Sequence, residues 1–400
     1  MVDGRLDPGR PVPATVQMSS NAATWLLSTV AGATITTAGV VFSLTVVSLQ
    51  LASSQFSPRV MRSFIRNRLS QLVIGLLVAT FVFCVLTLRH ISPDADAGAP
   101  RVSMTLAIAL TLATVVLIIA YPNRLAFGLQ VGEVARTIAD EAAVVLGHEV
   151  REVQAETSAS PDPQRAVPAL QVRAPADGWV TQAPSRHILS AMPPSTTVRL
   201  ETRTGAYIHR GEVLMSVWPC PQDARRVTRR LLSTVEIADS RTMQRDVDFA
   251  IRQLVDIALR ALSPAVNDPT TATEVILRLG SLLRDVLTGP QPPLAVAGEH
   301  SRVLLRPWIL SREEYVEHAF DQIRQAVGVQ VHVATAVLRV LQMLAVHVRE
   351  NDCQDVFPAL RAQERMLMAT VARNPDVHAH DLARLQAIFD DTDPAEHELS

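Results

Sequence analysis

The sequence contains no lysine, and all 37 basic residues in its 400 positions are arginine. A chain without lysine forms no Schiff base, has no phosphate-binding P-loop and carries no lysine-linked biotin or lipoyl group. The formal net charge of −2 also lacks the positive excess of a nucleic-acid-binding protein. The exclusive use of arginine is typical of a GC-rich, bacterial coding sequence.

Paired cysteines are missing as well. Cys84, Cys220 and Cys353 are isolated from one another, which argues against a disulfide framework and against a cysteine metal site. The chain also has no glycine-rich phosphate loop, no G-x-S-x-G nucleophile elbow and no Cys/His pairing. We therefore expect no enzyme activity, no metal and no cofactor.

Charge is nearly absent from three long hydrophobic stretches in the first third of the chain. Spans of about 25–51, 72–88 and 102–121 have the length that a helix needs to cross a bilayer. Residues 22–121 therefore predict a membrane region of three transmembrane helices, the last two forming a hairpin. Residues 1–21 are a polar tail whose mixed charges do not fit a signal peptide.

The loop between the first two spans carries basic residues and no acid, which indicates the cytoplasmic side of a membrane. Its arginines are Arg59, Arg62, Arg66 and Arg68. This predicts a multi-pass protein of the bacterial plasma (inner) membrane with its C-terminal domain in the cytoplasm. The same arginines are expected at the membrane surface, either as a topology anchor or in contact with anionic lipid headgroups.

The first span carries small and polar residues on a single helical face. They are Ser28, Gly32, Thr36, Gly39, Ser43 and Gln50. Such a stripe allows two interpretations, which are close packing against another helix and the lining of a polar pathway in an oligomer.

Beyond the membrane region the pattern predicts a mainly α-helical protein with a small β module. Residues 122–156 are an amphipathic helical extension, 157–168 a linker, 169–219 a small β-barrel or sandwich, 220–390 a helical domain and 391–400 an acidic tail. The sequence pattern of the β module looks like that of domains that carry biotin or lipoyl groups. Because the chain has no lysine to modify, we expect a binding or spacing module rather than a carrier.

Polar residues are densest between 241 and 272. Asp246, Arg252, Asp256 and Arg260 are candidates for an ion-pair helix, although a solvated face of salt bridges explains the same spacing. The following turn concentrates side-chain donors and acceptors, with Asp268 predicted as the N-cap of the next helix. Its candidate residues, for anion binding or for a structural corner, are Ser263, Asn267, Asp268, Thr270 and Thr271.

Four segments together resemble a bacterial family of predicted membrane proteins, the domain of unknown function 2254. They lie at 39–68, at 75–89, at 245–272 (RDVDFAIRQLVDIALRALSPAVNDPTTA) and, more loosely, at 318–326 (HAFDQIRQA). The resemblance implies a multi-spanning bacterial membrane protein but carries no activity to any residue. Members usually have another hydrophobic segment upstream of the first span, so the side of the N-terminus depends on whether such a helix precedes it.

Two functional hypotheses follow. The first is an oligomeric channel, transporter or gating protein, because three spans per chain need partners to enclose a pathway. The alternative is a membrane-anchored sensor or scaffold that binds an anionic ligand or a protein through its cytoplasmic domain. The expected partners are the lipid bilayer and further copies of the chain, with no nucleic acid.

Overall fold

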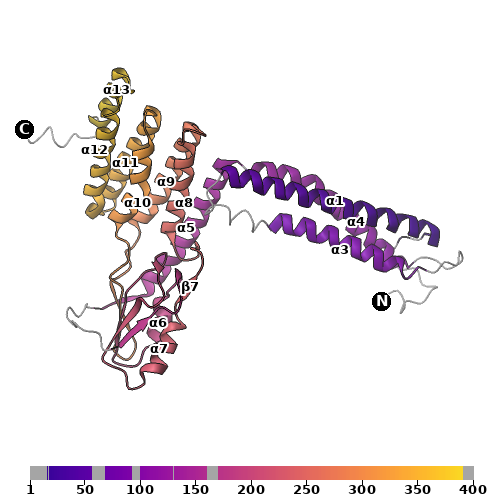
Figure 1. Cartoon of the computed structure of the whole chain (residues 1–400), viewed down its shortest axis with the longest axis horizontal. Coiled ribbons are helices and arrows are strands. Elements are labelled where there is room, and N and C mark those ends of the chain that lie inside the picture. Colours follow the sequence, from indigo (N-terminus) through magenta and orange to yellow (C-terminus); the bar gives the residue numbers. More distant parts are fainter. Residues whose placement is uncertain are drawn as a thin grey trace, which may run out of the picture. The chain divides into compact units, whose positions relative to one another are not determined.

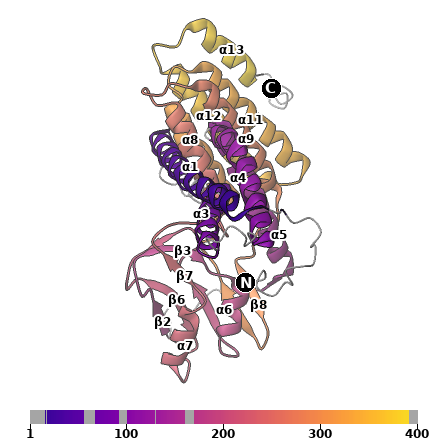
Figure 2. The ribbon, with the colours of Figure 1, turned by 90° about the vertical axis from the view of Figure 1, so that its right-hand side faces the viewer.

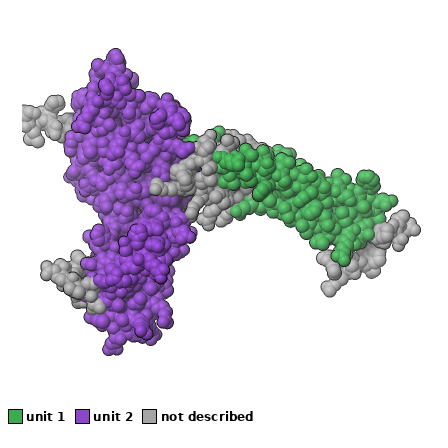
Figure 3. Space-filling view, in the orientation of Figure 1, with its two compact units in different colours: residues 1–133 green, residues 134–400 purple. Residues whose placement is uncertain are grey.

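The structure is a computed structural model that describes residues 16, 18–55, 68–91, 100–128, 130–159 and 170–390. The side chains of residues 51–55, 68–70 and 122–128 are not part of this description. The chain divides into two compact units, residues 1–133 and 134–400 (Figure 3). The polar N-terminal tail, apart from a few residues, and the acidic tail at 391–400 lie outside the described residues.

Unit 1 consists of three long helices, α1 (Ser20–Gln55), α3 (Arg68–Leu88) and α4 (Arg101–Gly128) (Figure 1). α3 packs along both α1 and α4. Alanines on one face of α1 permit close approach of the helices. The buried contacts form two clusters, Ala23, Leu27 and Ala31 with Cys84, Met104 and Ala107, and Ala38 and Val41 with Val73, Leu77 and Tyr121.

Four helices are long and apolar enough to cross a membrane: Ser20–Gln50, Gln71–Leu88, Arg101–Tyr121 and Val331–Glu350. The first three coincide with the three expected spans, and they leave large apolar side chains such as Trp25 and Ile119 exposed. The fourth candidate is more than half buried and packs between other helices of unit 2. Length and composition therefore support several apolar helices, and the count of three stays a prediction.

Helix α5 (Val131–Ala155) begins shortly after α4 ends and has the amphipathic pattern expected of it. Val134, Ile138, Ala142 and Val145 recur at helical spacing and are buried. The helix ends just before the expected linker, where Thr157–Ser158 forms the short strand β1.

The β module of unit 2 consists of two sheets around one core. The larger has the order β1-β8-β9-β4-β6-β2 and the smaller β5-β3-β7. The strands after β1 are β2 (Leu170–Arg173), β3 (Gly178–Gln182), β4 (Thr197–Leu200), β5 (Tyr207–Ile208), β6 (Val213–Trp218), β7 (Glu236–Ala238), β8 (Ala295–Gly298) and β9 (Arg302–Leu305). Helices α6 (Ser185–Ala191) and α7 (Ala224–Leu232) contribute Ile188 and Leu231 to the shared core.

The expected boundary of the β module at residue 219 is wrong. Strand β7 and the hairpin β8–β9 come from the region assigned to the helical domain, and β9 pairs in parallel with β4. Each of these strands has only three or four residues, too few to show a clear alternation. Their partners are distant in the sequence, so local pattern does not reveal them.

The helical part of unit 2 contains α8 (Val247–Ala261), α9 (Pro269–Thr288), α10 (Arg312–Ala326), α11 (Val331–Glu350), α12 (Phe357–Ala372) and α13 (Ala379–Asp390). α11 packs against α9 and α12, and α8 against α9 and α10. Gly280 of α9 lies so close to α11 that a Cβ would come within 2.6 Å of Val340. Figure 2 shows the strands at the opposite end of unit 2 from α13.

Candidate functional site

The candidate site is built around the first turn of α8. Asp246 is the N-cap, and one of its carboxylate oxygens accepts a hydrogen bond from the backbone N–H of Phe249 at 3.1 Å. Asp248 follows in the first turn, where a negative charge is favoured by the helix dipole. The sequence Asp-Val-Asp thus places two carboxylates at one helix end.

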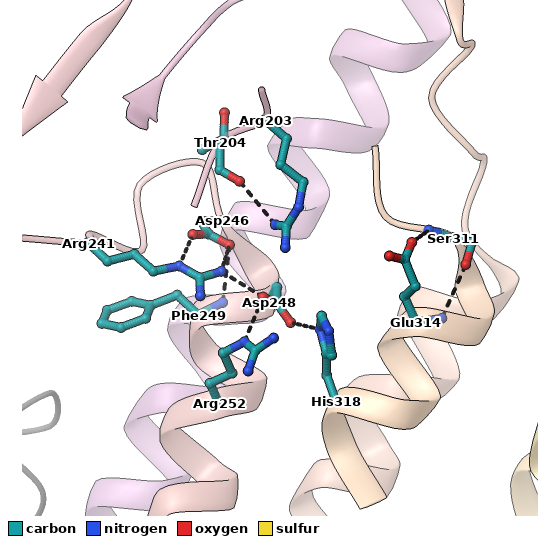
Figure 4. Close-up of polar contacts among 10 residues, drawn as sticks. All are labelled: Arg203, Thr204, Arg241, Asp246, Asp248, Phe249, Arg252, Ser311, Glu314 and His318. Carbon is teal, nitrogen blue, oxygen red and sulfur yellow. Dashed lines mark hydrogen bonds and ion pairs between the residues drawn. The ribbon is translucent and has the colours of Figure 1, made fainter. Parts of the chain in front are cut away.

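Three donors converge on Asp248, whose side chain is only 1% exposed (Figure 4). Arg241 Nη2 donates at 2.7 Å and Arg252 Nε at 3.0 Å, while His318 Nδ1 of α10 lies 2.7 Å away. Burial would raise the pKa of Asp248, but the hydrogen bonds and positive charges of these partners outweigh burial and hold it below its ordinary value. An ionised and saturated carboxylate of this kind positions its neighbours rather than accepting a proton.

Arg241 joins the two carboxylates. Its Nε and Nη2 donate to Asp246 at 2.5 and 2.8 Å, and Nη2 is shared with Asp248. The guanidinium also lies over the rings of Trp179 and Phe249, with distances of 5.9 and 5.4 Å to the ring centroids. These contacts connect the β module to the N-terminus of α8.

Gly205, in the segment between β4 and β5, packs directly against the Asp246–Arg241 ion pair from the β module. Its φ of +81° favours glycine, and a Cβ there would collide with Asp246 Oδ2 and lie 2.6 Å from Arg241 Nη2. The ion pair and the turn can therefore coexist only with glycine at this position.

A cavity of about 170 Å³ adjoins the network and is bordered by α5, the start of α8, α10 and loops of the β module. Three acids line one wall, Glu149 and Glu152 of α5 and Glu156 directly after it. The spacing of three residues puts Glu149 and Glu152 on one face of α5. Arg203, Arg245 and Arg306 also line the cavity.

Two of these three acids are paired. Arg245 binds Glu152 through two hydrogen bonds of 2.6 and 2.8 Å, and Arg306 binds Glu156 through two of 2.6 and 3.0 Å. The second pair is the more buried, and Arg306 also donates to Ser185 Oγ at 2.6 Å. We call these two ion pairs the α5 clamp, because they attach α5 to both the helical part and the β module.

The remaining polar groups of the cavity have few partners among the described residues. Arg203 makes one hydrogen bond, from Nη1 to the carbonyl of Thr204 at 3.3 Å (Figure 4), and Glu149 makes no hydrogen bond to a described side chain. Burial, then the negative charge of Asp246, raises the pKa of Glu149 to about 7, against the opposing effect of Arg245. Burial likewise raises the pKa of Tyr315, so its hydroxyl stays a hydrogen-bond donor.

A second cavity, of about 450 Å³, adjoins the first. The two share Glu152, Glu156 and Ser185 among their lining residues. The second lies between the end of α5, α6 and the β8–β9 hairpin, with Arg186 and Arg302 on its wall. The C-terminal turns of α5 thus border both cavities. A ligand bound in either cavity would contact the same helix.

The family model described as "Predicted membrane protein (DUF2254)" matches residues 1–343. The chain belongs to this family. Uncharacterised proteins of Mycobacterium bovis and Mycobacterium tuberculosis are each 34% identical over 368 residues, which cover 87% of this chain and 67% of theirs. No solved structure matches the chain. The resemblance expected from the sequence is confirmed, and the whole Asp248 network and its cavity lie within the region that the DUF2254 model matches.

The predicted turn of this DUF2254 chain is occupied by its own hydrogen bonds. Asp268 caps α9 and accepts from Thr271 N at 3.0 Å and from Thr271 Oγ1 at 2.5 Å. Asn267 has a φ of +46° and accepts from Gln330 at 2.9 Å, while Ser263 Oγ donates to the carbonyl of Arg260. Thr270 is exposed. These are the contacts of a capped corner, and a ligand role for the turn stays a prediction.

The predicted ion-pair helix is only partly brought together at the site. Asp246 lies in the Asp248 network as a cap, and Arg252 pairs with Asp248 one turn before it. Asp256 and Arg260 lie one and two turns beyond Arg252, further from the cavity. Sequence reasoning missed Asp248, Arg241 and His318 as a group. Both Asp248 and His318 lie within the residues that the DUF2254 model matches, but only the packing of α10 on α8 brings them together.

The polar stripe of α1 is exposed along its whole length on the isolated chain. Ser28, Gly32, Thr36, Gly39, Ser43 and Gln50 are all exposed, while the buried face carries Ala23, Leu27, Ala31, Ala38 and Val41. Within the part of the chain that the structure describes, α1 therefore packs through its other face. Arg59, Arg62 and Arg66 lie outside the described residues, as does the side chain of Arg68, so their role at the membrane surface stays a prediction.

Proposed function

We propose that this DUF2254 protein is a membrane-anchored sensor whose second unit binds a small charged ligand in the cavity beside the Asp248 network. The observation that carries the proposal is the wall of the cavity. One side of it is α5, and α5 follows the membrane helix α4 after only residues 129 and 130. A ligand that changes the position of α5 would therefore act on the segment that leads directly into the membrane region.

The α5 clamp supports this role because two ion pairs hold α5 against the rest of unit 2. Arg306 and Glu156 are 13% and 14% exposed, so their pair is shielded from solvent, whereas Arg245 and Glu152 are 31% and 50% exposed. A buried pair contributes strongly to a defined geometry when both partners are present and costs several kcal/mol when one is removed. A charged ligand in the adjoining cavity would compete with these same groups.

The test is hydrogen–deuterium exchange of the full chain in lipid nanodiscs. The variant Arg306→Ala should raise exchange in α5 and also in the C-terminal turns of α4. The control Arg278→Ala removes one member of the partly exposed Arg278–Glu274 pair on α9 and should leave both segments unchanged. If Arg306→Ala raises exchange around the cavity but leaves α4 as it was, α5 does not transmit the change and the proposal fails.

We also propose that unit 2 faces the cytoplasm, as the arginines between the first two spans predict. Cys220 is exposed, whereas Cys84 and Cys353 are buried, so the native protein already contains a probe. A membrane-impermeant maleimide should label Cys220 in spheroplasts only after the membrane is opened. The variant Cys220→Ser should lose the label, and labelling of intact spheroplasts at Cys220 would place unit 2 outside.

A second candidate function is an oligomeric channel or transporter, which the exposed stripe of α1 favours. Small residues on an outward helical face permit close contact with another copy of the chain. In a background without native cysteines, Ser43→Cys should form crosslinks between chains, while Phe42→Cys, on another exposed face, should not. Absence of crosslinks, together with liposomes that pass no ions or solutes, would leave the sensor as the better account.

A further inference from the structure

Among the described charged residues that line the first cavity, two lack an ion-pair partner, and they have opposite signs. Glu152 is paired with Arg245, and Glu156 with Arg306. Asp246 is paired with Arg241. The two that remain are Arg203 and Glu149.

Arg203 and Glu149 do not neutralise each other. No ion pair joins them, and the guanidinium of Arg203 uses one of its five N–H groups, in a hydrogen bond of 3.3 Å. Both side chains line the same cavity as Tyr315, from α5, from the segment between β4 and β5, and from α10. The pKa of the Tyr315 hydroxyl is raised by burial and then by the charge of Glu149, and the charge of Arg203 opposes this rise.

The space is large enough for a small ligand. A cavity of about 170 Å³ is roughly ten times the volume that one water molecule needs. It therefore admits a molecule with a handful of non-hydrogen atoms. A ligand with one charge would satisfy either Arg203 or Glu149 and leave the other partly buried and unpaired, which is unfavourable.

We propose that this cavity binds a small zwitterion, a free α-amino acid, with the carboxylate on Arg203 and Tyr315 and the ammonium group on Glu149. The inference rests on the proposed function, since it names the ligand of the same cavity. A guanidinium offers two parallel donors to a carboxylate, and the Tyr315 hydroxyl adds a third. One ligand then pairs both charges that the fold leaves without partners.

The pH dependence of binding separates a zwitterion from a simple anion. Glu149 faces Glu152 on its own helix, Arg245 and Asp246 at the start of α8, Arg203 from the β module and Tyr315 from α10. An ammonium group favours the ionised form of Glu149, so affinity for a zwitterion should rise between pH 6 and 8. An anion favours the protonated form, so its affinity should fall over the same range.

The test is calorimetric titration of the full chain in nanodiscs with L-alanine, propionate and ethylamine. Propionate is alanine without its ammonium group, and ethylamine is alanine without its carboxylate. We expect alanine to bind at least tenfold more tightly than either. Arg203→Gln and Glu149→Gln should each weaken alanine binding at least tenfold, whereas Arg225→Gln on α7 and Glu141→Gln on α5, both exposed and outside the cavity, should not.

Three outcomes decide the matter. Tighter binding of alanine, strengthening from pH 6 to 8, supports the zwitterion, and the pH series on the unmodified protein holds even if a variant fails to fold. Propionate bound as tightly as alanine would overturn the zwitterion and leave a sensor of anions. No binding by any of the three would also overturn it, and the exchange experiment on Arg306→Ala would then decide separately whether α5 is a coupling element.

Discussion

The two units of this chain use polar side chains in opposite ways. In unit 1, hydroxyl groups such as those of Thr36 and Thr80 donate to the carbonyl one turn back on their own helix. In unit 2, charged side chains such as Arg245 and Arg306 join elements that are distant in the sequence. A hydroxyl that donates to its own helix needs no hydrogen-bond partner in the lipid or on a neighbouring helix.

This difference indicates which substitutions should destabilise each unit. Association of the unit 1 helices depends on the fit of small and apolar faces, and Thr45 of α1 also shares a hydrogen bond with Tyr121 of α4. Unit 2 instead contains carboxylates that several donors share, so that the loss of one partner leaves charges buried without compensation. The predictions below test this contrast by removing polar groups from each unit.

The largest effect is expected for Asp248→Ala. The change leaves Arg241, Arg252 and His318 without their shared acceptor, and we expect the free energy of unfolding of unit 2 to fall by about 3–5 kcal/mol. Denaturant unfolding can be followed by tryptophan fluorescence in a Trp25→Phe background, since the other three tryptophans belong to unit 2. Asp140→Ala, at an exposed pair with Arg136, is the control and should cost less than about 1 kcal/mol.

Gly205→Ala should be the next most damaging change. An alanine there must adopt a positive φ and would collide with the Asp246–Arg241 pair, which together cost roughly 2–4 kcal/mol. Gly211→Ala is the matched control, because Gly211 also has a positive φ, of +86°, but a Cβ at that position would meet no atom within 4 Å. If both variants lower the free energy of unfolding equally in the same fluorescence assay, the close approach of Gly205 to the ion pair does not contribute to stability.

Glu149 should make the stability of unit 2 fall as pH rises. Its pKa of about 7 in the folded protein lies above the ordinary 4.5, so folding favours the protonated side chain. The contribution of Glu149 to the free energy of unfolding is therefore fully present below about pH 4.5 and is lost as pH rises through 7. The expected loss in the free energy of unfolding between pH 5 and 8 is of the order of 2 kcal/mol. Glu149→Gln should flatten this part of the profile, while Glu141→Gln should leave it unchanged. An identical slope in Glu149→Gln would assign the pH dependence to another group.

The smallest effect is expected in unit 1. Tyr121→Phe removes the hydroxyl that contacts Thr45, and hydrogen bonds between membrane helices average about 0.6 kcal/mol. A thermal unfolding scan in nanodiscs should therefore differ little from that of the parent protein or of Tyr207→Phe, an exposed position in unit 2. A loss as large as that of Asp248→Ala would break the contrast between the units.

The sequence predicts those features that depend on local composition. The three apolar helices of unit 1, the amphipathic α5 and the cap at Asp268 each follow from neighbouring residues. The strands β7, β8 and β9 do not, because each is short and pairs with a distant segment.

The candidate site divides in the same way. Asp246 and Arg252 stand out by spacing on one helix, whereas the cavity needs Glu149 from α5, Arg203 from the β module and Tyr315 from α10. A group gathered from several elements has no signature in any one of them. The one signal in the sequence is that Asp248 and His318 each lie in a segment, 245–272 or 318–326, that resembles the family.

The parallel pairing of β4 with β9 has a consequence for how the chain is made. Val198 lies opposite Leu304, and α7, α8 and α9 are synthesised between them. On the ribosome, β4 must therefore wait until the hairpin β8–β9 has emerged before the larger sheet can form, by which time the unit 1 helices have long been available for insertion. Contacts of such long range slow folding. We expect this interval to be the period in which the nascent chain depends most on chaperones.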